Sequence, residues 1–201
     1  MRNTFLPGCL DYLKKYNNQK ISYDLELYLK VFLYNISILH NTQHMLHIET
    51  WKDNPVLRTV CEPVKKSEWK KYAKLGREMR EYIKNPQHAG VGLAAPQVWV
   101  IKRVMVVSLM RNWDDDNFPT VIMINPKILE ASSETLCDIE EGCLSLPRAK
   151  KWYVARNKDI KLRYFDENMK ERILRLSWLA SVIVQHEIDH LNGELYIDKL
   201  I

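Results

Sequence analysis

Apolar side chains recur along residues 48–201 with two different periods, and these periods predict two helices among several short strands. Residues 68–83 place large apolar side chains at steps of three and four, the period of one helix face. That face consists of Trp69, Tyr72, Leu75, Met79 and Ile83. Asn85-Pro86 predicts the end of this helix, because proline disfavours helical backbone in the residue before it.

Short apolar runs bounded by turn residues predict the strands. Residues 104–109 and 121–124 flank three adjacent aspartates, Asp114–Asp116, which we interpret as a solvated hairpin tip rather than a cation site. Asn125-Pro126 predicts a turn after the second of these strands. Further strands are predicted at residues 152–155, 160–165 and 172–176, with a hairpin turn at Asp166-Glu167-Asn168.

A second helix is predicted near the C-terminus. Its apolar stripe comprises Trp178, Leu179, Val182 and Ile183, and it continues through His186 and His190 at helical spacing. Gly193 is a typical residue for the end of a helix, so both histidines are expected on the buried face. Many short strands with one late helix predict an α+β fold, in which short mixed or antiparallel sheets pack around this C-terminal helix.

Composition bounds the class of protein. The 201 residues, 46% hydrophobic and 27% charged, are typical of one globular domain with a core of its own. The net charge of +5 is compatible with an RNA or acidic partner but does not require one. The lysines of residues 65–74 are interpreted as a solvated helix face, so no dedicated nucleic-acid site is predicted. No apolar run approaches the roughly 18 residues of a membrane span.

Residues 1–47 differ from the rest of the chain, so we predict an N-terminal extension of uncertain role before a domain at 48–201. The extension holds one periodic segment, residues 25–39, one arginine and three acidic residues. Transit peptides are rich in arginine and poor in acids, which argues against an organelle leader. An extra helix, a leader and a start codon assigned too early, with Met45 the true one, all stay open.

The strongest chemical signal is the H-E-x-x-H sequence of the late helix. Because His186 and His190 are one turn apart, both can bind one metal ion, with Glu187 beside the open coordination position. A single buried histidine is more often a hydrogen-bonded core residue than a ligand. Two imidazoles on one buried stripe need partners, however, because unpaired buried polar groups cost about 1–3 kcal/mol each. The metal interpretation is therefore preferred.

A catalytic metal ion of this kind takes three protein ligands and keeps one position open. The metzincin pattern requires histidine at position 196, where this chain has Tyr196. Too few residues follow His190 for a second helix that returns a glutamate, although Glu194 and Asp198 remain formal alternatives. The third ligand is therefore expected from an upstream segment.

Cys143 is the upstream candidate that stands out. Gly142 and Pro147 predict a local bend that presents its side chain. A thiolate suits Fe(II), Zn, Co or Ni better than Mg or Ca. The alternative is a buried structural thiol, the commoner role of cysteine. The four cysteines of the chain form no C-x-x-C pair, which favours a reducing compartment over a disulfide framework.

Residues 90–97 combine two glycines, two alanines and a proline. This composition is poor for a helix and for a central strand, but it lets the backbone approach another molecule closely. A plain turn before the next strand is the alternative. The segment is not a phosphate-binding loop, since neither G-K-[ST] nor G-x-G-x-x-G is present.

Three of these segments together resemble the motifs of the peptide deformylase family. They are Gly90–Gln97, Glu141–Ser145 and Gln185–Gly193, in the family's order, and the resemblance covers residues 48–201. It implies the deformylase fold and a metal-dependent amidohydrolase acting on linear amides. The implied reaction removes the formyl group from the N-terminal formylmethionine of newly made polypeptides and releases formate.

The resemblance also implies roles for individual residues. One divalent metal ion per chain is expected, Fe(II) in the cell with Zn, Ni or Co able to substitute; its ligands are Cys143, His186 and His190. Glu187 is expected as general base and then acid. Gln97, through its side-chain amide, and Leu144, through its backbone N–H, are expected to polarise the formyl oxygen.

Substrate binding is expected from two groups of residues. Gly90 and Gly92 allow the backbone to pair with an extended peptide, as in strand addition. Val91, Leu179, Val182 and Ile183 are predicted to form the apolar socket for methionine; three of these four lie on the helix that carries the histidines.

The expected partners are formylmethionyl nascent peptides, with no membrane partner. Formylmethionine implies bacterial-type translation, hence the cytoplasm of a bacterium or, alternatively, an organelle of that descent. Docking at the ribosome exit region is left open, since the chain ends at Ile201 without the extra helix that some relatives use there. Two competing hypotheses are a general metallopeptidase, which does not depend on Cys143, and a metal-stabilised binding module, which leaves Glu187 and Gln97 without roles.

Overall fold

The computed structural model describes residues 46–88 and 90–201. The predicted extension, including the periodic segment 25–39, lies outside these residues apart from its last two. Two α-helices are described, α3 (Trp69–Lys84) and α4 (Trp178–Leu191), together with three short 3-10 helices at Lys66–Glu68, Ala95–Val98 and Tyr196–Asp198. No helix of the described part is long and apolar enough to span a membrane.

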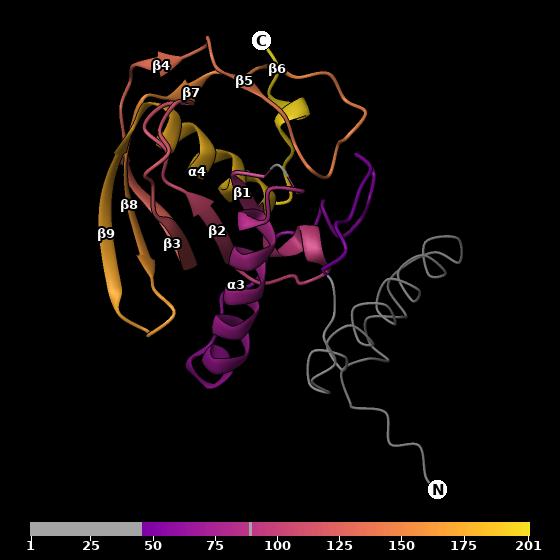
Figure 1. Ribbon diagram of the computed structural model, residues 1–201, viewed down its shortest axis with the longest axis vertical. Coiled ribbons are helices and arrows are strands. Elements are labelled where there is room, and N and C mark those ends of the chain that lie inside the picture. The colour runs from indigo at the N-terminus through magenta and orange to yellow at the C-terminus, as the bar shows by residue number, and fades with distance from the viewer. Residues whose placement is uncertain (1–45, 89) are drawn as a thin grey trace, which may run out of the picture. The chain divides into compact units, whose positions relative to one another are not determined.

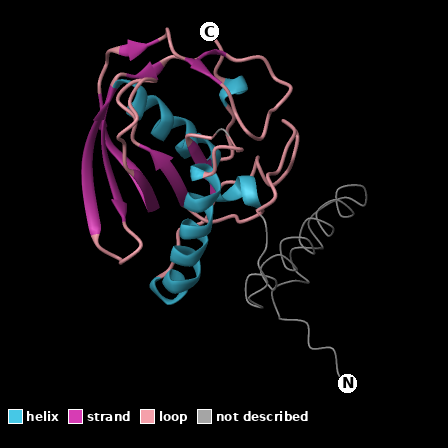
Figure 2. Ribbon diagram, viewed as in Figure 1, coloured by secondary structure: helices cyan, strands magenta, loops and turns pink. Residues whose placement is uncertain are grey.

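The main sheet has five antiparallel strands in the order β1-β2-β3-β8-β9 (Figures 1 and 2). These are β1 (Gly92–Ala94), β2 (Val104–Ser108), β3 (Thr120–Ala131), β8 (Asp159–Phe165) and β9 (Glu171–Ser177). Two small antiparallel sheets join β4 (Thr135–Leu136) to β7 (Arg156–Asn157) and β5 (Glu140–Glu141) to β6 (Trp152–Tyr153). The predicted α+β class, with short antiparallel sheets around a late helix, is confirmed.

The two helices pack on opposite faces of the main sheet. Side chains alternate between the faces of a strand. Met105 and Val107 of β2 belong to the core cluster formed with α4. The opposite face of the sheet packs against α3, where a Cβ on Gly76 would lie only 2.5 Å from Ile122 of β3. All five residues of β2 are buried, because both faces of this strand are covered.

Helix α4 runs through the core of the domain. From Leu179 to Leu191 only His186 is not buried. The helix ends at Leu191, shortly before Gly193 as predicted. Gly193 has a φ of +76°, a conformation that suits glycine, and a Cβ there would lie 2.7 Å from the Arg58 carbonyl oxygen. Trp178 was expected in the buried stripe, and this is wrong: it is 51% exposed, beneath the Lys158 ammonium.

The predicted turn at Asn125-Pro126 is also wrong, because β3 continues through both residues. The register of β3 against β8 shifts between Ile124 and Lys127, which marks a bulge. Asn125 adopts a φ of +52°, and its side chain bonds both the N–H and the C=O of Val64 at 2.8 and 2.9 Å. Pro126 has no N–H to donate to a neighbouring strand, and a bulge tolerates this loss. Asn125 and Pro126 can therefore lie within a strand instead of forming a turn.

The remaining local predictions hold with small changes. The helix predicted at 68–83 is α3, and the hairpin turn after β8 is closed by the Asp166 carboxylate, which accepts from the N–H groups of Asn168 and Lys170. The strand predicted at 152–155 is shorter, with only two residues in β6. The aspartate tip is not wholly solvated, since Asp115 is buried and paired with Arg111.

Candidate metal centre and active-site cleft

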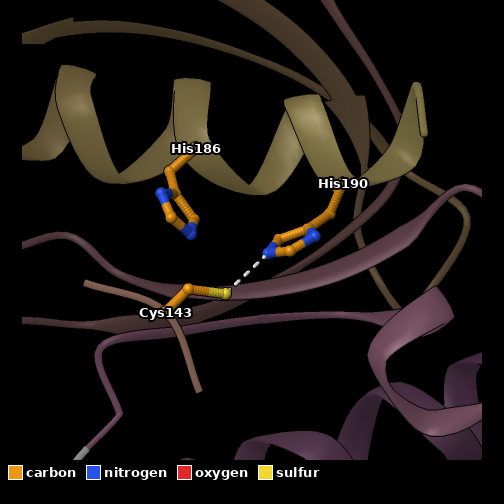
Figure 3. A group of neighbouring side chains, drawn as sticks. All are labelled: Cys143, His186 and His190. Atoms are coloured by element: carbon orange, nitrogen blue, oxygen red, sulfur yellow. Dashed lines mark hydrogen bonds between the residues drawn. The ribbon is translucent and has the colours of Figure 1, made fainter. Parts of the chain in front are cut away.

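Cys143, His186 and His190 come together in one place (Figure 3). Cys143 lies just after β5, and the two histidines project from α4 toward it. The Cys143 Sγ atom is 3.2 Å from His190 Nε2, and one ligand atom from each residue lies within 4.8 Å of the others. The upstream cysteine and the two helical histidines therefore form one potential ligand set.

The chemistry of this set fits a divalent transition metal. Burial opposes ionisation of the Cys143 thiol, but His190 and His186 beside it hold its pKa well below the ordinary value. A thiolate is the ligand form of cysteine, and two imidazoles with one thiolate suit Zn or Fe(II). Three ligands from the protein leave one coordination position open, as in catalytic rather than structural sites.

A carboxylate orients His186 from behind. His186 Nδ1 is 2.7 Å from Glu141 Oε2, which leaves the other ring nitrogen for a metal ion. Arg156 donates to both oxygens of Glu141, at 2.7 and 2.9 Å. Burial would raise the pKa of Glu141, but these His186 and Arg156 contacts lower it to about 2. Glu141 is therefore an anion fixed by two partners.

The same network reaches α4 and the C-terminal segment. Arg156 also donates to Asp189, and Lys199 donates to Asp189 at 2.6 Å. No sequence motif predicts a role for Arg156, Asp189 or Lys199. The sequence does hold one indication of the role of Glu141. A metal-binding histidine needs a hydrogen-bond partner for its second ring nitrogen, and Glu141 is an acid in the motif that contains Cys143.

Glu187 lies in a contrasting environment. It is 4% exposed, and its Oε2 atom has no hydrogen-bond partner in the described part of the chain. Gly92 provides its space: a Cβ on Gly92 would overlap the carboxylate and come within 2.8 Å of Glu187 Cγ. Burial raises the pKa of Glu187 to about 7. This side chain can therefore accept or release a proton near neutral pH.

Gln97 is held with its amide nitrogen toward the ligand set. Its Oε1 accepts from Ala94 N at 2.8 Å, while Nε2 donates to Ser145 Oγ at 3.1 Å and lies 3.7 Å from Cys143 Sγ. Because the amide oxygen is engaged by Ala94, the donor end faces the cleft. In residues 46–88 and 90–201 the Leu144 N–H has no acceptor, so it too is available to a ligand.

These groups surround a cleft with a volume of about 370 Å³. Every predicted site residue except His190 lines it, and His190 lies behind at 1% exposure. Its apolar part contains the four predicted socket residues, Val91, Leu179, Val182 and Ile183, and also Ile139. Trp113 and Lys151, which are not among the predicted site residues, line the cleft as well. The cleft thus combines an apolar lining with the candidate metal ligands.

One wall of the cleft is the edge of the main sheet. Among the described residues β1 pairs only with β2, and Val91 O accepts from Ser108 N at 2.8 Å. Backbone groups of alternate residues point to alternate sides of an antiparallel strand. The N–H and C=O of Gly92 are therefore directed away from β2, toward the open edge where an extended peptide can pair.

The formal alternatives for a third ligand are engaged elsewhere. Glu194 pairs with Lys199, and Asp198 pairs with Arg58. Tyr196, at the position of a metzincin histidine, stacks on His186 with ring centroids 5.9 Å apart and donates to the Lys150 carbonyl. The structure therefore leaves Cys143 as the third ligand candidate.

Comparison with known proteins agrees with this geometry. The family model described as polypeptide deformylase matches residues 45–201. The chain belongs to the polypeptide deformylase family. A peptide deformylase of Enterococcus faecalis is 38% identical over 160 residues, covering 73% of this chain and 86% of that protein. One of Ligilactobacillus salivarius is 39% identical with the same coverage.

Solved structures of the family share the fold. The peptide deformylase of Thermotoga maritima has a TM-score of 0.69 at 37% identity, covering 79% of this chain and 99% of that one. A Met-Ala-Ser-bound class I type b peptide deformylase from Acinetobacter baumannii has a TM-score of 0.69 at 32% identity, covering 79% of this chain and all of that one. The predicted deformylase fold is confirmed.

The predicted activity is confirmed at the level of the family. The chain is an enzyme, a hydrolase that removes the N-formyl group from the N-terminal formylmethionine of newly made polypeptides and releases formate. The family is metal-dependent, and the group formed by Cys143, His186 and His190 is the matching candidate site.

Proposed function

We propose that Cys143, His186 and His190 hold one divalent metal ion, Fe(II) in the cell, with Zn, Ni or Co able to substitute. Bound there, the ion supplies Lewis acidity, which polarises carbonyl oxygens and makes water more acidic. The thiolate and two imidazoles favour these ions over Mg or Ca. The Glu141 carboxylate behind His186 supports this arrangement, because it fixes the ring and its tautomer.

Glu187 moves the proton. It takes a proton from the water that attacks the formyl carbon, and it later delivers that proton to the methionine nitrogen as the C–N bond breaks and formate leaves. Its burial, its unpartnered oxygen and its pKa of about 7 support this role. The space beside Gly92 lets the carboxylate reach into the cleft.

Gln97 and Leu144 stabilise the oxyanion that develops on the formyl oxygen. The Gln97 amide nitrogen lies 3.7 Å from Cys143 Sγ, and its other end is fixed by Ala94 N, so no reorientation is needed during the reaction. Removing one such donor from comparable sites costs about 2.7–4 kcal/mol of transition-state stabilisation. The Leu144 N–H supplies a second donor without using a side chain.

The substrate is a formylmethionyl peptide in extended conformation. Methionine occupies the apolar part of the cleft, lined by Val91, Leu179, Val182 and Ile183. The peptide backbone pairs with the open edge of β1 at Gly90 and Gly92. A relative from Acinetobacter baumannii has been solved with Met-Ala-Ser bound, which supports a peptide of this kind here.

The same chemistry sets the partners and place of action. Formylmethionine is made by bacterial-type translation, so the enzyme acts on nascent chains, in the cytoplasm of a bacterium or in an organelle of bacterial descent. Residues 48–201 form the catalytic domain, and residues 1–47 are an extension of it.

The observation that carries this proposal is the meeting of the cysteine and two histidines beside an unpartnered buried glutamate. The test is formate release from formyl-Met-Ala-Ser by protein loaded anaerobically with Fe(II), beside a zinc-loaded sample. We expect the Fe(II)-loaded wild-type protein to turn over the substrate and to bind its metal tightly. We expect Cys143→Ala to lose this tightly bound metal. Full metal content in Cys143→Ala would remove this residue from the site, and cleavage of unformylated peptides instead would indicate a general metallopeptidase.

A further inference from the structure

A second groove lies where β3 and β8, adjacent strands of the sheet in Figure 1, meet the C-terminal end of α4. It has a volume of about 630 Å³ and is lined by Pro63, Arg103, Asn125, Pro126, Lys127, Ile128, Arg163, Phe165, Ile188 and Asn192. None of these residues lines the catalytic cleft, and none is acidic. Three of them carry a positive charge, and deformylation uses none of them.

Two of the cations are neighbours on adjacent strands of the sheet. Lys127 of β3 and Arg163 of β8 are directly opposite in the antiparallel register, so their side chains lie on the same face. Like charges in such positions destabilise a sheet. Lys127 has no carboxylate partner within the described part of the chain, and Arg163 approaches Glu171 only to 4.0 Å. The buried Nε of Arg163 also lacks a hydrogen-bond partner there.

In residues 46–88 and 90–201 the third cation, Arg103, has only neutral hydrogen-bond partners. Its guanidinium donates to Asn192 Oδ1 at 2.9 Å and, more weakly, to the carbonyls of Leu191 and Pro126, both at 3.4 Å. These contacts hold the Arg103 side chain at the end of α4 but do not neutralise its positive charge. Ile128, Phe165 and Ile188 give the groove an apolar lining beside the cations. The groove thus joins two cations that have no carboxylate partner in the described residues, and a third whose carboxylate partner is 4.0 Å away, to an apolar surface.

We propose that this groove binds a small phosphate ester with an apolar or aromatic body, of about mononucleotide size. A phosphate between Lys127 and Arg163 would turn their repulsion into two charge-assisted hydrogen bonds, and the guanidinium fork matches phosphate geometry. Arg103 adds positive potential from the facing wall, and the body of the ligand lies against Phe165 and Ile188. The volume is within the range of small-molecule sites.

Calorimetry and thermal unfolding of the full-length, metal-loaded enzyme with 5′-AMP or inorganic pyrophosphate test this site. Ligand at about ten times its Kd should raise the Tm by roughly 3–6 °C. Lys127→Ala and Arg163→Ala should each weaken binding by about tenfold. Lys161→Ala is the matched control: it removes the same charge from β8, two residues from Arg163, but Lys161 is paired with Glu130 at 2.6 Å and does not line the groove.

The probes also identify the part of the ligand that is recognised. Tighter binding of 5′-AMP than of pyrophosphate is expected, because the apolar lining then contributes to affinity. The reverse order would contradict the apolar body in the proposal and indicate recognition of the phosphoryl groups alone. A short RNA oligonucleotide that binds through Lys127 and Arg163 locates the same phosphate site on a polymer. Saturation with the product peptide Met-Ala-Ser should leave phosphate binding unchanged.

Three results would overturn the proposal. The first is no binding of any probe to the wild-type enzyme at millimolar concentration. The second is an equal loss of affinity in Lys127→Ala and Lys161→Ala, which would indicate diffuse attraction to the surface. The third is displacement by Met-Ala-Ser, which would place the phosphate at the catalytic metal. In phosphate-free buffer Lys127→Ala should be at least as stable as wild type, and a lower Tm would show that Lys127 has a structural partner instead.

Discussion

Two walls of the catalytic cleft each carry one buried glutamate. The loop wall (residues 140–147) holds Glu141, whose two oxygens are taken by Arg156 and His186. The helix wall (α4) holds Glu187, whose Oε2 has no partner in the described residues. The pKa of Glu141 is lowered to about 2, although burial opposes this, and the pKa of Glu187 is raised to about 7 by burial itself.

The difference shows how one cleft assigns separate tasks to two identical side chains. A carboxylate with cationic partners stays charged and fixes its neighbours, while a carboxylate without them exchanges a proton near neutral pH. Burial alone does not decide between these tasks, since both side chains are almost inaccessible. The partners that each wall supplies decide it.

The largest effect is expected from removing the proton acceptor of the helix wall. Glu187→Gln keeps the size of the side chain but cannot take a proton, so kcat should fall by about 10²–10⁴-fold. Metal content should stay at one ion per chain, because the three ligands are untouched. Steady-state formate release and metal analysis of the same sample measure both, and a rate within a few-fold of wild type would contradict the assignment of Glu187.

A smaller loss is expected when Glu187 is kept but displaced. A Cβ on Gly92 overlaps its carboxylate, so Gly92→Ala should move that group and lower kcat by about 10²-fold. Gly142→Ala is the matched control on the loop wall, where the nearest atom to the new Cβ is the flexible Lys151 side chain at 3.4 Å. Equal rates for the two variants would show that space beside Glu187 is not critical.

Weakening the loop wall should affect the metal more than the chemistry. Glu141→Gln loosens the contact that orients His186, so metal affinity should fall by about 10–100-fold. At saturating metal most of the activity should return, unlike that of Glu187→Gln. Competition with a chelator measures the affinity, and a variant that binds metal normally but stays inactive would give Glu141 a part in the chemistry.

The smallest effect is expected at the outer end of the loop-wall network. Lys199 contacts Asp189 at 2.6 Å but is partly exposed, with 36% of its side chain accessible. Lys199→Ala should therefore cost at most about 1 kcal/mol of unfolding free energy, or about 2–4 °C in Tm. Thermal unfolding measures it. A drop above 8 °C would mean that this lysine is needed for the buried network.

The meeting of Cys143, His186 and His190 could be predicted because motifs carry these residues in short stretches of sequence. Helical spacing alone places His186 and His190 together, and the neighbouring motif contains Cys143. Arg156 could not be found in this way, since it belongs to no motif and reaches Asp189 across 33 positions of the chain. Contacts of that kind depend on how β7 and α4 pack, which local periodicity does not encode.

The errors in the fold have the same origin. Asn125-Pro126 has the composition of a turn, but Val64, distant in the chain, holds Asn125 in a bulge within β3. Trp178 fits the period of the buried stripe, yet α4 is buried on nearly all sides and Trp178, its first residue, is the one that is exposed. In both cases the tertiary surroundings override a correct local pattern.

The open edge of β1 has a consequence for the range of chains that the enzyme can process. A glycine backbone offers a partner only N–H and C=O groups, and every polypeptide presents the same groups in return. Backbone pairing of this kind does not depend on the side chains that follow methionine. Pairing through this edge, as proposed, would therefore let one enzyme accept nascent chains with many different residues after methionine.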